Sequence, residues 1–382
     1  MTNPIKLLQI SCTSEWVQSR VFPTLFNDNR FSLENTVEII RDTGHLQELL
    51  SESEIGKTLW QKISSGETHY FPISAMSGNG LPEQAYKNVD ALVIHSLNGS
   101  HFYYIEKAIM NGKDVICEKP LVPLMDSMGN ADRSELDTLV ELTMLGDKKE
   151  LIMMDAEHYS AKKISRILFD RIDELVEKYG KITNVIGELK EKDNPSNPRT
   201  QRILSLDNRT GLLEDTGVHL LSFITNLGSR VETVSEVCYD AYQNYDVETY
   251  ASVKVSLAPA KLFSDSAEFN FTLAKFVNLM KEPQPESKYL EFTLKKGTAE
   301  TKLRVDFLEQ RIYLIGANDF KEEVTSKTEH SDLEYVNILN DFYQAYTTGV
   351  SPRTNFSKSI ITLEGLYKIR SYRDKEKVNV YA

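Results

Sequence analysis

The chain has 382 residues and a formal net charge of −12, and its length suits two domains that each bury a core. Its Lys and Arg residues form no basic cluster, which excludes the charge pattern of a nucleic-acid or anionic-membrane binder. No apolar run could span a bilayer and the amino terminus lacks a signal-peptide pattern, so we expect a cytoplasmic protein. The three cysteines are far apart and lack metal-finger or CxxC spacing, so we expect reduced thiols.

The first predicted elements are buried strands over residues 5–11 and 36–40, which would open a mononucleotide-binding half. The turn after the first strand reads SCTSEW and holds none of the glycines of the G-x-G-x-x-G fingerprint, which let a backbone approach a pyrophosphate. A dinucleotide bound here would depend on backbone N–H groups and on three hydroxyls. These belong to Ser11, Thr13 and Ser14.

Arg41 and Asp42 close the second predicted strand, where a carboxylate would bind the adenosine ribose hydroxyls and an arginine a 2′-phosphate. Both residue types are present in adjacent positions, so the residues leave NAD and NADP open as cofactors. The segment 44–87 is predicted to add helix and loop.

Residues 90–121 predict a strand, a turn, a helix and a second strand. A short apolar run at 91–95 ends at the turn signal Asn98-Gly99, helical spacing follows until Gly112, and a second buried strand covers 114–117. Such a unit is parallel and right-handed, and its ligands bind beyond the carboxyl ends of the strands. Lys119 lies at that end.

The rest of the chain changes character near residue 181. A helix at 134–145, a strand at 150–155 and a helix at 160–179 precede it, and period-2 segments typical of an antiparallel sheet follow. The predicted fold is α/β, with a Rossmann-like parallel sheet domain and an α+β domain that holds a large, mostly antiparallel open sheet. The expected domains are residues 1–155, residues 156–350, and a C-terminal helix in 351–382 that returns to the first domain.

Two motifs resemble those of the Gfo/Idh/MocA family, the glucose–fructose oxidoreductase and inositol dehydrogenase relatives. The first runs from Asn98 and His101 through Ala-x-x-x-Gly-Lys to Glu118-Lys119-Pro120. The second is Gly211-Leu-Leu-Glu-Asp-Thr-Gly-Val-His219, similar to the family's Gly-x-x-x-Asp-x-Gly-x-His pattern. The pair is more specific than either motif alone.

The resemblance implies roles for these residues. Lys119 would touch the substrate hydroxyl near the nicotinamide, with Glu118 orienting its surroundings. Asn98 and His101 would contact the nicotinamide and its ribose, although turn and helix capping is an alternative for both. In the second domain His219 would accept a proton, alone or with Lys119. Asp215 would bind the substrate and orient the histidine. The strand that the family places along the floor of the substrate cleft would end with Glu157, His158 and Tyr159, although a structural buried histidine is an alternative for His158.

The spacing of Asp215 and His219 supports a functional pair on its own, because residues four apart share one face of a helix. A carboxylate beside an imidazole fixes its tautomer and raises its basicity, as removal of a hydroxyl proton requires. Asp215 could instead cap or pair within its helix. A metal site is the other alternative, but no third ligand is evident, so no metal is predicted.

These observations predict an NAD(P)-dependent dehydrogenase or reductase. By the resemblance, it acts on a secondary alcohol or ketone of a sugar, sugar phosphate or cyclitol. The open sheet face favours a homodimer or homotetramer. The alternative is a non-catalytic sugar- or dinucleotide-binding regulator of the same fold, which the glycine-free turn favours and the joint presence of Lys119, Asp215 and His219 disfavours.

Overall fold

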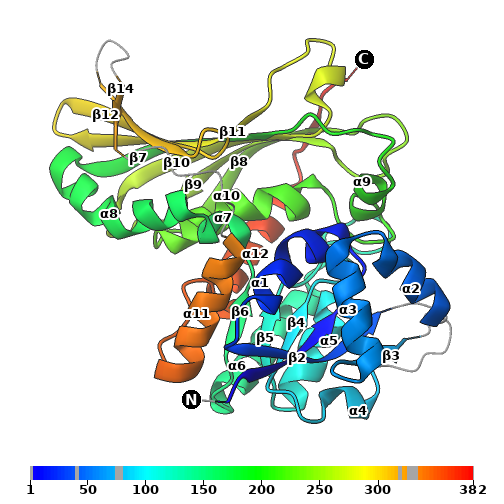
Figure 1. Cartoon of the computed structure of the whole chain (residues 1–382). Helices are drawn as coiled ribbons and strands as arrows, with labels where there is room; N and C mark the ends of the chain where they lie inside the picture. The colour runs from blue at the N-terminus through cyan, green and yellow to red at the C-terminus, as the bar shows by residue number, and fades with distance from the viewer. Residues whose placement is uncertain (1–2, 39–42, 74–80, 317–320, 325–333, 382) are drawn as a thin grey trace. The chain divides into compact units, whose positions relative to one another are not determined.

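The computed structural model describes residues 3–38, 43–73, 81–316, 321–324 and 334–381 (Figure 1). The predicted ribose ligands Arg41 and Asp42 lie outside the described residues. The chain divides into two compact units. The first comprises residues 1–121, 139–156 and 335–356, and the second comprises 122–138, 157–334 and 357–382.

The first unit is built on a six-stranded sheet in the order β3-β2-β1-β4-β5-β6, in which all pairs are parallel. β4 is fully buried, as expected of a parallel strand covered on both faces. The order reverses between β1 and β4, where ligands of such sheets bind. The predicted Rossmann-like fold is confirmed. The strands are β1 (Ile5–Ile10), β2 (Phe31–Glu38), β3 (His69–Pro72), β4 (Ala91–Ile94), β5 (Asp114–Cys117) and β6 (Met153–Asp155).

Helices pack around this sheet, and the segment 44–87 contains one strand that the sequence pattern missed. This strand, β3, has four residues that are only partly buried or exposed, so it gave almost no apolar signal. The helical segments are η1 (Val17–Val21), α1 (Phe22–Phe26), α2 (Thr43–Ser51), α3 (Glu54–Ser65), α4 (Glu83–Tyr86), η2 (Asn98–Ser100), α5 (His101–Met110), α6 (Ser134–Lys148) and α11 (Glu334–Thr348).

The second unit holds a nine-stranded sheet in the order β14-β13-β12-β11-β7-β10-β9-β8-β15. It is mostly antiparallel, as predicted, with parallel pairs only between β7 and β10 and between β8 and β15 in the described strands. Burial alternates strictly along β9. The strands are β7 (Lys181–Lys190), β8 (Val231–Asp240), β9 (Tyr250–Leu257), β10 (Phe263–Ala274), β11 (Ser287–Lys296), β12 (Ala299–Asp306), β13 (Arg311–Ile315), β14 (Lys321–Glu323) and β15 (Glu376–Lys377).

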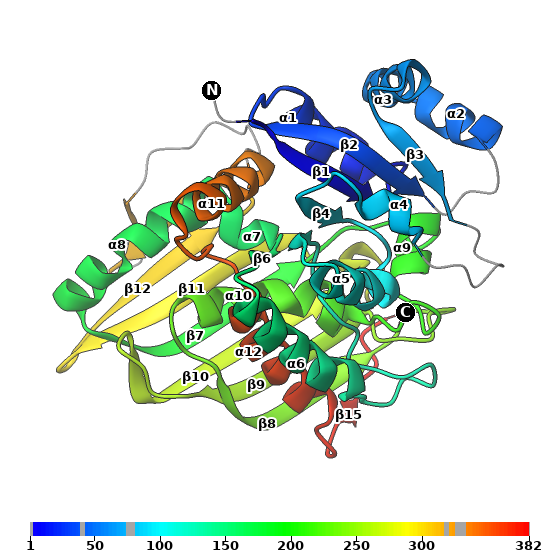
Figure 2. The ribbon, with the colours of Figure 1, turned by 90° about the horizontal axis from the view of Figure 1, so that it is seen from below.

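The helices α8, α10 and α12 lie on one face of this sheet (Figures 1 and 2). The other face carries no α-helix in the part of the chain that the structure describes. The helical segments of this unit are α7 (His158–Ala161), α8 (Lys163–Tyr179), α9 (Pro198–Ile203), η3 (Leu213–Gly217), α10 (Val218–Asn226), η4 (Val277–Leu279) and α12 (Phe356–Arg370).

The C-terminal helix α12 belongs to the second unit, whereas the sequence analysis expected it to return to the first. Its contacts explain the difference. The hydroxyl of Thr362 donates to that of Thr225 at 3.0 Å, and the guanidinium of Arg370 binds Glu214 with two hydrogen bonds of 2.6 Å. The helix that joins the first unit is the preceding one, α11. There, the ring of Tyr335 lies 5.5 Å from the ring of His95.

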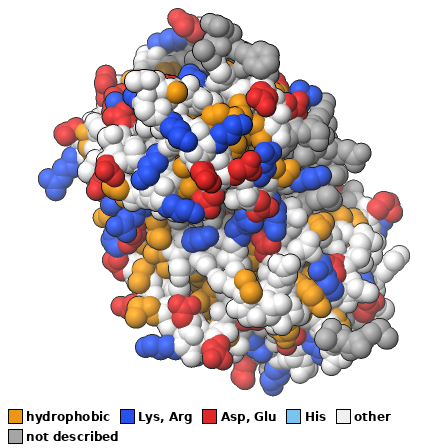
Figure 3. Space-filling view, turned by 90° about the vertical axis from the view of Figure 1, so that its left-hand side faces the viewer, with side chains coloured by type: hydrophobic (Ala, Val, Ile, Leu, Met, Phe, Trp, Pro, Cys, Tyr) orange, Lys and Arg blue, Asp and Glu red, His pale blue; other side chains and the backbone are white. Residues whose placement is uncertain are grey.

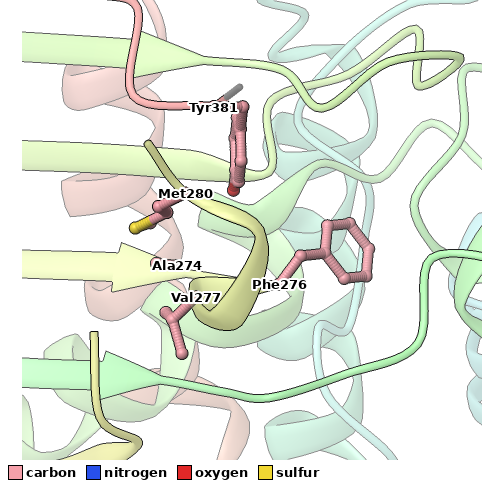
Figure 4. Packing of buried hydrophobic residues seen from close by; sticks show 5 residues of the cluster. All are labelled: Ala274, Phe276, Val277, Met280 and Tyr381. Carbon is pink, nitrogen blue, oxygen red and sulfur yellow. The ribbon is translucent and has the colours of Figure 1, made fainter. Parts of the chain in front are cut away.

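The chain end is held to the second sheet by a small apolar cluster around Tyr381 (Figure 4). The ring of Tyr381 packs with Phe276, Val277 and Met280, and its hydroxyl donates to the carbonyls of Thr249 at 2.8 Å and Lys275 at 2.9 Å. The last residues are therefore part of this unit's core and fix the segment just after β10.

The charged surface is mixed. On the face shown in Figure 3, Lys and Arg side chains are interspersed with Asp and Glu. Among the described residues, no helix is both long and apolar enough to cross a membrane.

Candidate active site

Lys119 lies directly beyond the carboxyl end of β5. The backbone N–H of Glu118 donates to the carbonyl of Ile94 at 2.9 Å, which continues the pairing of β5 with β4 up to the lysine. Lys119 is 8% exposed, so the residue is buried rather than part of a solvated loop. This placement follows from the βαβ pattern of the sequence.

His101 is held by backbone carbonyls in this structure, and its expected contact with a cofactor stays a prediction. It is fully buried, and its Nδ1 and Nε2 lie 2.8 and 2.9 Å from the carbonyl oxygens of Pro120 and Ser96. Burial lowers the pKa of His101, against the opposite effect of the two carbonyls and of Glu118. Because both ring nitrogens face the backbone, His101 ties the turn after β4 to the segment that carries Lys119.

Buried polar groups near the carboxyl ends of β1 and β4 fit a bound ligand. The Nδ2 of Asn98 and the Nε2 of His95 are buried and have no hydrogen-bond partner among the described residues. Burial lowers the pKa of His95 to about 4, so the ring is neutral at pH 7. The amide nitrogen of Gln9 lies 3.2 Å from Nδ1 of His95. Because an amide nitrogen can only donate, the ring proton of His95 is on its own Nε2. Both side chains thus offer N–H donors of the kind a nicotinamide dinucleotide needs. The sequence analysis missed Gln9 and His95, although a histidine that ends an apolar strand is a detectable signal.

The hydrogen-bond donors of the glycine-free turn after β1 are satisfied by the side chain of Glu38. One oxygen of Glu38, Oε2, accepts from the backbone N–H groups of Cys12 and Thr13 at 2.8 and 3.0 Å. It also accepts from the hydroxyls of Ser11 and Thr13 at 3.2 and 2.9 Å. The hydroxyl of Ser14 accepts from the N–H of Val17 at 3.2 Å.

The predicted pyrophosphate donors Ser11, Thr13 and Ser14 are therefore engaged within the first unit in this structure, and their role toward a dinucleotide stays a prediction. The described part of β2 ends at Glu38, and the predicted end of the strand at residue 40 lies outside the described residues. The predicted strand 36–40 contains Glu38, which was given no functional role from the sequence.

In the second unit His219 is paired with Glu157. The Nδ1 of His219 lies 2.5 Å from Oε1 of Glu157, and the two side chains are 5% and 0% exposed. Glu157 is itself fixed as the N-cap of α7, where it accepts from the N–H groups of Tyr159 at 3.0 Å and Ser160 at 2.7 Å. A proton on Nδ1 then leaves Nε2 as an acceptor.

This geometry corrects the expected role of Asp215 as the group that orients His219. Glu157 does so from a position 62 residues away in sequence, a separation that no local pattern reveals. The helix that holds the motif is also irregular, because Leu213–Gly217 forms a π-helical segment before α10 begins.

The predicted substrate residues His158 and Tyr159 lie against His219. The ring centroids of both are 4.4 Å from that of His219, with Tyr159 stacked on it. Burial, and then several nearby carboxylates, raise the pKa of Tyr159 well above its usual value. Its phenol therefore stays protonated and can donate a hydrogen bond but not act as a base.

Asp215 lies beside a buried lysine that the sequence analysis missed. The Nζ of Lys275 is 4.0 Å from Oδ2 of Asp215 and 3.8 Å from Oδ2 of Asp193, and it forms an ion pair with Glu191. Burial opposes the charge of Lys275, but the carboxylates outweigh it and hold the pKa of the lysine above its usual value. Asp215 thus faces a permanent cation.

The glycine that begins the second motif is required by close packing. A Cβ at Gly211 would collide with the carboxylate of Glu248, which forms an ion pair with Arg370 of α12. Arg370 also binds Glu214, the neighbour of Asp215. This buried network fixes the segment that carries Asp215 and His219.

Residues 61–137 match the model of a family described as an oxidoreductase family with an NAD-binding Rossmann fold. This segment of the chain therefore resembles the Gfo/Idh/MocA family. The matched residues include Asn98 and Lys119, whereas the turn after β1 and the motif at Asp215 lie outside them. The predicted family resemblance is confirmed over residues 61–137, a segment that matches an NAD-binding Rossmann fold of an oxidoreductase family.

Two solved structures are similar to this chain over nearly its whole length. A 3-ketoreductase from Actinomadura kijaniata, in complex with NADP and TDP-benzene, has a TM-score of 0.71 at 16% identity and covers 98% of this chain and 100% of its own. A UDP-N-acetylglucosamine 3-dehydrogenase from Acidithiobacillus ferrooxidans has a TM-score of 0.68 at 14% identity and covers 96% of each chain. At these identities the likeness shows a common fold. No curated protein matches the sequence.

Proposed function

We propose that the chain is a cytoplasmic NAD(P)-dependent oxidoreductase that transfers a hydride between a nicotinamide cofactor and a secondary alcohol or ketone of a sugar derivative. The observation that carries the proposal is the buried pair of Glu157 and His219, because it presents an imidazole with a fixed tautomer and an accepting Nε2.

Bound nicotinamide would accept or supply the hydride. In the oxidative direction, His219 accepts the hydroxyl proton at Nε2, and Glu157 stabilises the imidazolium that forms. The ammonium of Lys119 stabilises the developing alkoxide or shares the proton transfer. In the reductive direction, the same groups return a proton to the carbonyl oxygen. Asp215 binds a substrate hydroxyl, while His158 and Tyr159 contact the sugar ring.

The two structural neighbours suggest where to begin with substrates. One is named a 3-ketoreductase and was solved with NADP and a TDP derivative, and the other is a dehydrogenase of a UDP-sugar. We propose nucleotide-linked sugars as the first class to screen, followed by free sugars, sugar phosphates and cyclitols. The open face of the second sheet supports a homodimer or homotetramer, which light scattering on the purified protein would measure.

The experiment that tests this function combines binding and turnover. Thermal unfolding with NAD, NADH, NADP and NADPH should reveal at least one ligand, since one at 100 times its dissociation constant stabilises by about 2.7 kcal/mol. Absorbance of the reduced nicotinamide would then follow turnover across the substrate classes. The proposal is wrong if no nicotinamide form binds at millimolar concentration.

A non-catalytic binder of sugars or dinucleotides is the second candidate, and the position of Glu38 favours it. The carboxylate engages the donors of the turn where a pyrophosphate would bind. Sugar binding by a protein that neither binds a nicotinamide dinucleotide nor transfers hydride to any substrate of the screen would support this alternative.

A further inference from the structure

The turn after β1 is an anion site that is filled by the chain's own carboxylate. Four donors from three consecutive residues converge on one oxygen of Glu38, two of them backbone N–H groups and two of them hydroxyls. Convergence of this kind on an anionic oxygen is how backbone turns hold a phosphate oxygen. Glu38 is 9% exposed, so the arrangement is part of the interior.

The position of this turn in the sheet indicates which ligand would compete with Glu38. β1 pairs with β2 on one side and with β4 on the other, so the turn lies at the point where the strand order reverses. Dinucleotide phosphates approach parallel sheets at this point. The side chain that fills the turn therefore competes with the phosphates for the same donors.

Two anions cannot share these donors. An N–H group that donates to the carboxylate has no second proton for a phosphate oxygen. A phosphate near the turn would also meet the charge of Glu38 at close range inside the protein, where like charges repel strongly.

We propose that Glu38 is an internal anion that closes the first βα turn, so that a nicotinamide dinucleotide binds only by displacing this carboxylate. This inference rests on the proposed function, because it concerns the affinity of the same cofactor. It assigns Glu38 a role opposite to that of an acid that binds the adenosine ribose. Such an acid strengthens dinucleotide binding, whereas an internal competitor weakens it.

The test is calorimetric titration of NAD and NADP with the wild type, Glu38→Gln and Glu34→Gln. Glutamine keeps the shape of Glu38 but has no charge, and one of its terminal groups is a donor that cannot accept from the turn. Glu34 is the matched control, since it lies on the same strand and binds Ser32 at 2.7 Å rather than the turn. Glu38→Gln should bind both cofactors at least about tenfold more tightly than the wild type, and Glu34→Gln should stay within about twofold.

Other results overturn the inference in distinguishable ways. If the wild type binds a dinucleotide and Glu38→Gln binds it equally or more weakly, Glu38 is not a competitor, while the proposed function stands. If none of the three proteins binds, the proposed function fails together with the inference. Should Glu38→Gln not fold, Glu38→Ala tested by the shift of its unfolding temperature with NAD replaces it, and a shift no larger than that of the wild type counts against the proposal.

Discussion

Two buried glutamates of this protein make the same local structure and have different consequences. Glu38 and Glu157 each accept hydrogen bonds from two successive backbone N–H groups, those of residues 12 and 13 and those of residues 159 and 160. Glu157 also binds the Nδ1 of His219 and leaves its Nε2 able to accept a proton. Glu38 is bound instead by two hydroxyls of the turn itself. A carboxylate held by amides thus contacts a histidine in one unit and fills a turn in the other.

The largest expected effect on turnover comes from removing the side chains that we propose to move protons. Lys119→Ala and His219→Asn should each reduce turnover by about 10² to 10⁴, because each removes a group that handles a proton in the transition state. Dinucleotide affinity should stay nearly unchanged. Steady-state kinetics and calorimetry measure the two quantities.

Lys113→Ala is the matched control, since this lysine precedes β5 and donates to the carbonyl of Val89 at 2.8 Å. If Lys119 and His219 act on one substrate, the double variant should lose much less than the product of the single losses. Full multiplication of the two effects would speak against a common site, and an active Lys119→Ala would return Lys119 to a structural role.

Local patterns in the sequence predicted most of the elements, because periodicity reports burial of one face. β5 was predicted with its observed limits, and Lys119 followed from its place after that strand. β3 was missed because an edge strand with partly exposed side chains has no clear period. The C-terminal helix α12 was assigned to the wrong unit because its partners, such as Glu214, are 156 residues away.

The site was harder to predict than the fold, since side-chain partners depend on contacts between distant segments. The pair of Glu157 and His219 and the bond between Glu38 and the turn join residues 62 and 25 apart. Lys275 was missed for the same reason, because its carboxylate partners come from three separate positions of the chain.

The second prediction concerns Glu157 alone. In Glu157→Gln the amide can donate to Nδ1 of His219, which places the ring proton on Nε2 and removes the acceptor. We expect turnover to fall by about 10 to 10², with KM nearly unchanged. Glu157→Asp keeps the charge and should retain more activity than the glutamine variant. Equal kcat values for Glu157→Gln and the wild type would show that the carboxylate only caps α7.

A third carboxylate, that of the half-buried Asp114, sharpens the comparison because a backbone donor, the N–H of Ile152, contacts it at 2.8 Å. Burial raises the pKa of Asp114 to about 6. The folded state therefore holds a proton that the unfolded state releases near pH 4, and stability falls as the pH rises from about 4 to 6.

Asp114→Asn stays neutral and keeps an oxygen for the N–H of Ile152. It should exceed the wild type in unfolding free energy by about 1 to 2 kcal/mol at pH 7 and match it at pH 4. Chemical denaturation at both pH values measures the difference. An advantage of the asparagine that does not change with pH would contradict the raised pKa.

The smallest effect tests whether Glu38 and the turn act as one unit. Thr13→Val keeps the shape of the side chain and removes the hydroxyl that donates to Glu38 at 2.9 Å, so it should lower the unfolding free energy by about 0.5 to 1.5 kcal/mol. The same change in Glu38→Gln should cost less, because the hydrogen bond to a charged acceptor is already lost. Thr24→Val is the matched control. Its hydroxyl donates to the carbonyl of Arg20 at 3.0 Å, so its cost should be the same with either residue at position 38. If Thr13→Val also lowers the unfolding free energy equally in both backgrounds, the hydroxyl of Thr13 does not help to hold Glu38. Displacing the carboxylate from the turn would then require less free energy than four hydrogen bonds imply.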